Sequence, residues 1–181
     1  IYSSVKELLS HTDSQIDIES LSAFYKAYQE KSVLKIGELW AIPIMLRLAL
    51  IENLQRIATR LQLNTKHRDI ANLWVEKLED TALKKPSKLI EIVADMAHAD
   101  IPTSGSFVSE FIQRLSSQNS ALQIARNWLE QRLAEDGLFI DELIYQENQY
   151  QAVNQLSVNH IINSLRFINT TDWKVFVENQ S

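Results

Sequence analysis

The chain of 181 residues has no cysteine and only three glycines and three prolines. The absence of cysteine excludes disulfide bonds, thiol nucleophiles and thiolate metal ligands. A β-rich protein needs many more turn residues than these few glycines and prolines supply. The composition therefore predicts an all-α protein, with long helices and short connections.

The chain also lacks an excess of basic charge. Its formal net charge is −5 and its isoelectric point is near 5.4, and lysines and arginines do not gather as they do in nucleic-acid-binding proteins. We therefore expect no nucleic-acid partner. Apolar residues make up 45% and charged residues 23% of the chain, as in ordinary folded proteins. The length predicts a single helical domain over residues 1–181.

Apolar residues recur at helical spacing along most of the chain, which predicts a bundle of about eight helices. The expected helices cover residues 17–31, 35–63, 65–84, 87–98, 106–117, 119–136, 138–153, 155–169 and 171–178. Pro102, Gly105 and neighbouring hydroxyl residues indicate a candidate subdomain linker at 98–105. Gly137 fits a left-handed helix C-cap, and Thr171 or Asp172 fits an N-cap of the final helix.

A nearly uncharged stretch runs from Leu39 to Ile51 and contains a single charged residue, Arg47. A membrane-spanning helix needs about 20 apolar residues in succession, and Glu38 and Glu52 bracket a shorter run here. We therefore expect no membrane span in this chain. Pro43 lies within the stretch and predicts a kink in the helix.

Residues 44–51 are apolar around nearly the whole helical wheel, a pattern typical of a helix surrounded by other elements. We expect them to be the most buried helical segment of the bundle, with Trp40 also in the core. Arg47 projects from an apolar face of this segment, and a buried guanidinium must be paired. We expect an ion pair between Arg47 and Glu38 across the bend at Pro43. The alternative is that Arg47 binds a ligand.

No pattern of catalytic, cofactor-binding or metal-binding residues occurs in the sequence. The four histidines are scattered singly, and no phosphate-binding loop or nucleophile motif is present. The acidic pairs at 135–136 and 141–142 flank Gly137, where helix-terminal charges are favourable. We therefore expect no catalytic residue, no cofactor and no metal.

Two blocks of the sequence have a family resemblance. The first is FYKAYQEKSVLKI followed by GELWAIPIMLRLALIENLQRIA (residues 24–58), and the second is NWLEQRLAEDGLFIDELIYQENQYQAVNQLSVNHIINSLRFINTTDWKVFVE (residues 127–178). Together they resemble the N-terminal region of cyclic β-1,2-glucan synthases, which are large bacterial inner-membrane enzymes. The resemblance implies a parent protein that transfers glucose from UDP-glucose. The family's transferase motifs lie outside this segment, so no catalytic residue is carried over.

The resemblance suggests a segment on the cytoplasmic side of the inner membrane, N-terminal to the first membrane spans. The chain starts at Ile1 and stops at Ser181 within a helical pattern, so we expect a fragment of a longer protein. The favoured hypothesis is a non-catalytic accessory or regulatory domain that contacts other domains of the parent chain. The alternative is a carbohydrate-binding module that holds the growing β-1,2-glucan, with Trp173 as the candidate exposed aromatic contact.

Overall fold

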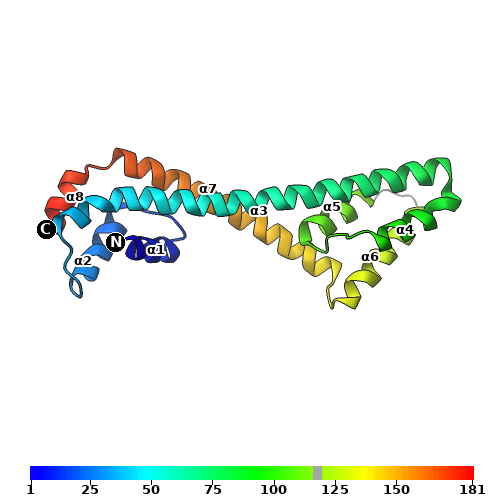
Figure 1. Ribbon diagram of the computed structural model, residues 1–181, viewed down its shortest axis with the longest axis horizontal. Helices are drawn as coiled ribbons and strands as arrows, with labels where there is room; N and C mark the ends of the chain where they lie inside the picture. Colours follow the sequence, from blue (N-terminus) through cyan, green and yellow to red (C-terminus); the bar gives the residue numbers. More distant parts are fainter. Residues whose placement is uncertain (116–119) are drawn as a thin grey trace. The chain divides into compact units, whose positions relative to one another are not determined.

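The protein is all-α, as the sequence predicts. The computed structural model describes residues 1–115 and 120–181 (Figure 1), and these contain eight α-helices, two short 3-10 helices and no strand. The elements in chain order are α1 (Tyr2–His11), α2 (Ile18–Gln29), α3 (Ile36–Lys84), η1 (Pro86–Lys88), α4 (Leu89–His98), α5 (Gly105–Leu115), η2 (Ser120–Leu122), α6 (Gln123–Glu135), α7 (Ile140–Thr170) and α8 (Trp173–Gln180).

The chain forms two compact units, each assembled from separated parts of the sequence. The first unit comprises residues 1–59 and 153–181, and the second comprises residues 60–152. The boundaries therefore fall inside the two long helices α3 and α7. The expected linker at 98–105 lies within the second unit, where it joins α4 to α5.

The two long helices are each continuous where the sequence predicts a break. The 49 residues of α3 include Pro43, which is buried, and the helix continues through it without interruption. A proline inside a helix removes one backbone hydrogen bond, and α3 nevertheless extends on both sides of Pro43. The expected helix ends near Leu63 and Val153 are wrong, because neither position carries a glycine or proline that would stop a helix.

In the first unit, α1, α2 and α8 pack with the ends of α3 and α7. Helix α8 lies beside α2 (Figure 1). The fully buried ring of Tyr25 packs edge-on against Phe176 of α8, with ring centroids 6.4 Å apart. Burial raises the pKa of the Tyr25 phenol. Helix α1 was not predicted, although its Val5, Leu8 and Leu9 are buried at helical spacing.

In the second unit, the remainder of α3 and α7 packs with α4, α5 and α6. Phe107 and Phe111 of α5 are fully buried, and their rings stack with centroids 5.4 Å apart. Gly105 starts α5 directly against α7, because a Cβ at this position would approach the Leu143 carbonyl oxygen to 2.9 Å. Only glycine allows this close packing without displacement of α7.

The predicted helix ends at Gly137 and Asp172 are confirmed. Gly137 has a φ of +71°, a left-handed conformation that suits glycine after a helix. The Asp172 side chain accepts hydrogen bonds from the backbone N–H groups of Lys174 and Val175 at the start of α8. Asp17 caps α2 in the same way by accepting from the backbone of Ser20.

Candidate interaction surface

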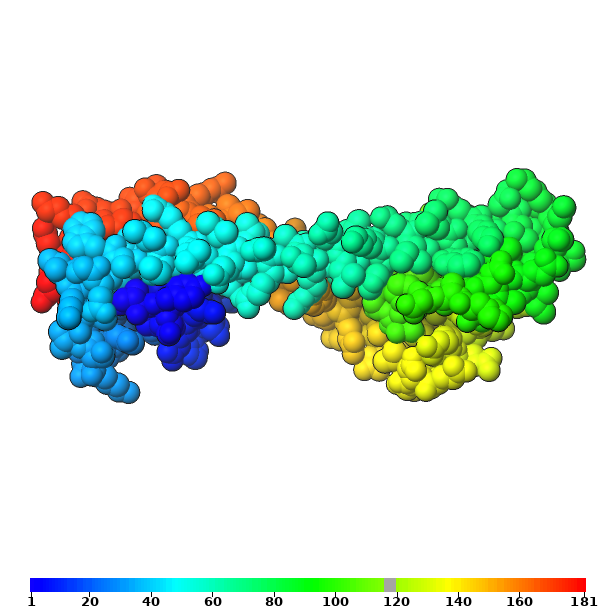
Figure 2. All heavy atoms as spheres, in the orientation of Figure 1, coloured from blue at the N-terminus to red at the C-terminus, as the bar shows by residue number. Residues whose placement is uncertain are grey.

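Helix α3 carries two opposite apolar faces in the first unit, and only one of them is buried. The buried face is formed by Leu39, Ile42, Leu46, Ala49 and Leu50, each at most 2% exposed. The opposite face consists of five large side chains that we call the α3 stripe: Ile36 (65% exposed), Trp40 (46%), Ile44 (60%), Leu48 (46%) and Ile51 (54%). In Figure 2 this part of α3, in cyan, lies at the surface of the first unit.

The expectation that residues 44–51 are the most buried helical segment is therefore wrong. At about 100° per residue, the five residues of the α3 stripe lie within an arc of about 120°. From Ile36 to Ile51 the helix rises about 22 Å. A row of large exposed apolar side chains on a folded protein is a candidate interaction site. The α3 stripe is consequently the leading candidate for a functional surface.

Arg47 lies within the arc of the α3 stripe, and the expected buried ion pair with Glu38 does not form. The Arg47 side chain is exposed, and its Nη2 donates a hydrogen bond to Asn169 Oδ1 of α7 at 3.0 Å. Glu38 instead accepts a hydrogen bond from the backbone N–H of Lys35 at 2.8 Å. This contact caps the start of α3, as glutamate at the third position of a helix commonly does.

The two tryptophans singled out from the sequence have the opposite exposures to those expected. Trp40 was predicted in the core but lies on the α3 stripe. Trp173 was predicted as an exposed contact but is half-buried, and its Nε1 donates to the Ile168 carbonyl oxygen at 2.8 Å. Its ring packs edge-on against Phe167 and Phe176. Trp173 is thus a packing residue of the first unit.

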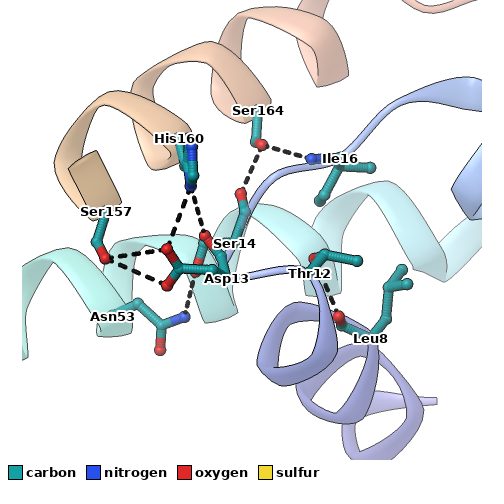
Figure 3. Close-up of polar contacts among 9 residues, drawn as sticks. All are labelled: Leu8, Thr12, Asp13, Ser14, Ile16, Asn53, Ser157, His160 and Ser164. Atoms are coloured by element: carbon teal, nitrogen blue, oxygen red, sulfur yellow. Dashed lines mark hydrogen bonds and ion pairs between the residues drawn. The ribbon is translucent and has the colours of Figure 1, made fainter. Parts of the chain in front are cut away.

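A polar cluster fixes the turn between α1 and α2, and Figure 3 shows its contacts. Asp13 and Ser14 have φ angles of 48° and 63°, which are uncommon for residues other than glycine. His160 Nδ1 lies 3.1 Å from the Asp13 carbonyl oxygen and 3.3 Å from its carboxylate. Ser157 Oγ donates to the same carboxylate at 3.2 Å. Helix α7 therefore holds Asp13 by both its backbone and its side chain.

The following residues of the turn are tied to α7 and α3. Ser164 Oγ, which is buried, donates to the Ser14 carbonyl oxygen at 2.6 Å and accepts from the Ile16 backbone N–H at 3.0 Å. Asn53 Nδ2 of α3 donates to Ser14 Oγ at 3.0 Å. Strained backbone persists when its surroundings over-determine it, and these bonds provide that constraint. The polar cluster was missed in the sequence because its members are far apart in the chain.

A polar pocket of about 380 Å³ lies beside this turn. Its lining residues are Lys6, Leu9, Ser10, Asp13, Ser14, Ala49, Glu52, Asn53 and Arg56. Tyr2 donates a hydrogen bond to Glu52, and this bond raises the pKa of the Tyr2 phenol. The lining mixes both signs of charge and has no nucleophile oriented by a base.

The second unit contains a serine–histidine contact whose surroundings indicate a structural role. His67 Nδ1 lies 2.8 Å from Ser104 Oγ. The same Ser104 oxygen accepts a hydrogen bond from the Phe107 backbone N–H at the start of α5. Glu147, the nearby buried carboxylate, pairs with Arg68 at 2.8 Å and orients no histidine. A catalytic triad needs an acid that positions the histidine, and this cluster instead joins α3, α5 and α7.

Residues 1–115 and 120–181 were expected to contain neither a metal site nor a membrane span. These residues include no group of three or more histidine, aspartate or glutamate side chains placed to hold a metal ion. Their helices include none that is both long and apolar enough to cross a membrane.

The chain is similar over nearly its full length to part of a known glucan synthase. It is 34% identical over 175 residues to the cyclic beta-(1,2)-glucan synthase NdvB of Rhizobium meliloti strain 1021, and the match covers 96% of this chain. No protein-family model matches the sequence. The match confirms the resemblance to cyclic β-1,2-glucan synthases on which the sequence interpretation depends. The chain spans only 6% of the length of that relative.

Proposed function

We propose that this chain is a non-catalytic helical accessory domain of a cyclic β-1,2-glucan synthase-like protein, and that it contacts other domains of the same parent. The observation that carries the proposal is the α3 stripe. Five large apolar side chains remain about half exposed on a helix whose other face is fully buried. Surfaces of this kind are costly in water and are normally covered by a partner.

The activity that we propose for the longer parent protein rests on the family resemblance alone. A protein of this family transfers glucosyl units from UDP-glucose to build β-1,2-glucan, on the cytoplasmic side of the bacterial inner membrane. In the proposal this segment contributes no catalytic residue and no cofactor to that reaction. The mixed-charge pocket and the helix-capping role of Ser104 agree with a structural assignment.

The proposal is tested in the full-length parent by making the α3 stripe polar. The double variant Ile44→Ser/Leu48→Ser is expected to lower glucose incorporation from UDP-glucose into β-1,2-glucan several-fold. The matched control is Leu73→Ser/Leu83→Ser, which changes two exposed leucines of α3 in the second unit. Wild-type activity in the first double variant, with the protein folded and membrane-integrated, would contradict a role of the stripe in the parent.

One observation favours carbohydrate binding as a second candidate function. The Trp40 indole is 46% exposed, and exposed aromatic rings are the usual stacking platforms for sugar rings. Titration of the chain with β-1,2-glucan oligosaccharides would then shift tryptophan fluorescence, and Trp40→Ala would abolish the shift. A titration without any shift, or one that persists in Trp40→Ala, would reject this site for the glucan.

A further inference from the structure

The α3 stripe and the Arg47 guanidinium beside it together restrict which partner can bind this face of α3. We infer that the stripe binds a helix from another part of the parent chain, and that this helix supplies a carboxylate to Arg47. The inference rests on the proposed function and deepens it by naming the partner's chemistry.

The spacing of the α3 stripe fits a helical partner. Its residues follow one another at intervals of four, four, four and three, so they form one ridge along the helix. Helices pack by placing such ridges in the grooves of a neighbour, with their axes about 8–10 Å apart. Trp40 is the kind of aromatic anchor that dominates binding energy at protein interfaces, and the branched aliphatic side chains add apolar area that a partner can bury.

Arg47 restricts which partner can cover this ridge. A guanidinium group has five N–H donors, and Arg47 directs a hydrogen bond to the neutral side chain of Asn169. Among residues 1–115 and 120–181 it forms no ion pair. A partner that covers the stripe removes this charge from water, which is unfavourable without a compensating anion. A carboxylate matches the fork geometry of arginine best.

A second copy of this chain offers no free carboxylate for this purpose on its own α3 stripe. Glu38 and Glu52 are the acidic residues that flank the stripe in α3. Glu38 caps the start of α3, and Glu52 accepts a hydrogen bond from Tyr2. At about 100° per residue both lie outside the arc of the stripe.

An anionic lipid surface is also disfavoured, because the chain carries a net charge of −5. The NdvB relative is far longer than this chain, which spans 6% of it. A parent of that size has ample further sequence to supply the helix. The partner to which we commit is therefore a helical segment of the same parent, with an aspartate or glutamate opposite Arg47.

The test uses the full-length parent with a photo-reactive benzoylphenylalanine in place of Leu48. Mass spectrometry identifies the cross-linked segment, and the cross-linking yield is compared among Arg47→Met, Arg47→Glu and a control. The control is Lys26→Glu, which reverses an exposed charge on a different helix of the first unit, α2. Because Arg47 and Lys26 are both exposed, the variants should keep the circular dichroism spectrum of the chain, and their thermal unfolding should change little.

We expect a cross-link to a helix outside this chain that contains an acidic residue. Arg47→Met should lower the cross-linking yield because it leaves the partner's carboxylate unpaired. Arg47→Glu should lower the yield further, by at least about tenfold, because two negative charges then face each other. Lys26→Glu should have no effect. Changing the acidic residue of the cross-linked helix to lysine should restore the yield in Arg47→Glu.

The two hypotheses fail in different ways. If Arg47→Met cross-links to an outside helix as well as wild type or better, the carboxylate inference is overturned and the accessory-domain proposal stands. If the cross-links reach only lipid, a second copy or this chain itself, or if none form, both are overturned. A cross-link to a helix outside this chain that has no acidic residue also overturns the carboxylate inference alone.

Discussion

Replacing Ser164 with alanine tests whether the turn between α1 and α2 depends on α7 for its conformation. Ser164 is 1% exposed, and its Oγ lies 2.6 Å from the Ser14 carbonyl oxygen and 3.0 Å from the Ile16 backbone nitrogen. Alanine removes a donor and an acceptor together. Each buried group left without a partner costs about 1–3 kcal/mol. We therefore expect the first unit to lose about 2–4 kcal/mol, taking partial relaxation of the turn into account.

The assay is hydrogen exchange combined with urea denaturation. The Ile16 amide should lose protection in Ser164→Ala, while amides in the second unit keep theirs and serve as an internal reference. The matched control is Ser157→Ala, which removes a longer contact to the exposed Asp13 carboxylate and should cost at most about 1 kcal/mol. If Ser164→Ala is no more destabilising than Ser157→Ala and Ile16 stays protected, the turn does not depend on α7.

Three further predictions concern α3 and two helix ends. Leu46→Ala should lower the free energy of unfolding by about 2–5 kcal/mol because Leu46 is fully buried, and Leu48→Ala on the stripe should lower it much less. Equal urea midpoints for the two variants would contradict the description of α3 as buried on one face and exposed on the other. Gly137→Ala should lower stability by about 1–2 kcal/mol because of its positive φ, and an unchanged melting temperature would refute this. Asp17→Ala should cost about 1 kcal/mol near neutral pH through loss of the α2 cap. The hydrogen bond from the Ser20 backbone lowers the pKa of Asp17. The stability that the Asp17 carboxylate contributes is therefore complete above the ordinary aspartate pKa and is lost as the pH falls through the lowered pKa. If the stability difference between wild type and Asp17→Ala stays constant into acid, the charge of Asp17 is irrelevant to the cap.

The sequence alone determines the all-α class, most helix positions and the helix ends at Gly137 and Asp172. These features depend on interactions among residues within about four positions of one another, so the local pattern contains the necessary information. The expected break near Thr65 in α3 is wrong, and the reason is again an interaction between residues close in sequence. Threonine is tolerated in a helix, and Thr65 Oγ donates to the Leu61 carbonyl oxygen within α3.

Only the tertiary structure decides which apolar face of α3 is covered. Helical periodicity shows that α3 is apolar on two sides, but which side is buried depends on elements distant in sequence. The Asn169 that meets Arg47 is 122 residues away. The left-handed turn at Ser14 is likewise held by Ser164, 150 residues along the chain. Burial and long-range hydrogen bonds follow from how helices pack, and two equally apolar faces give the sequence no basis for choosing between them.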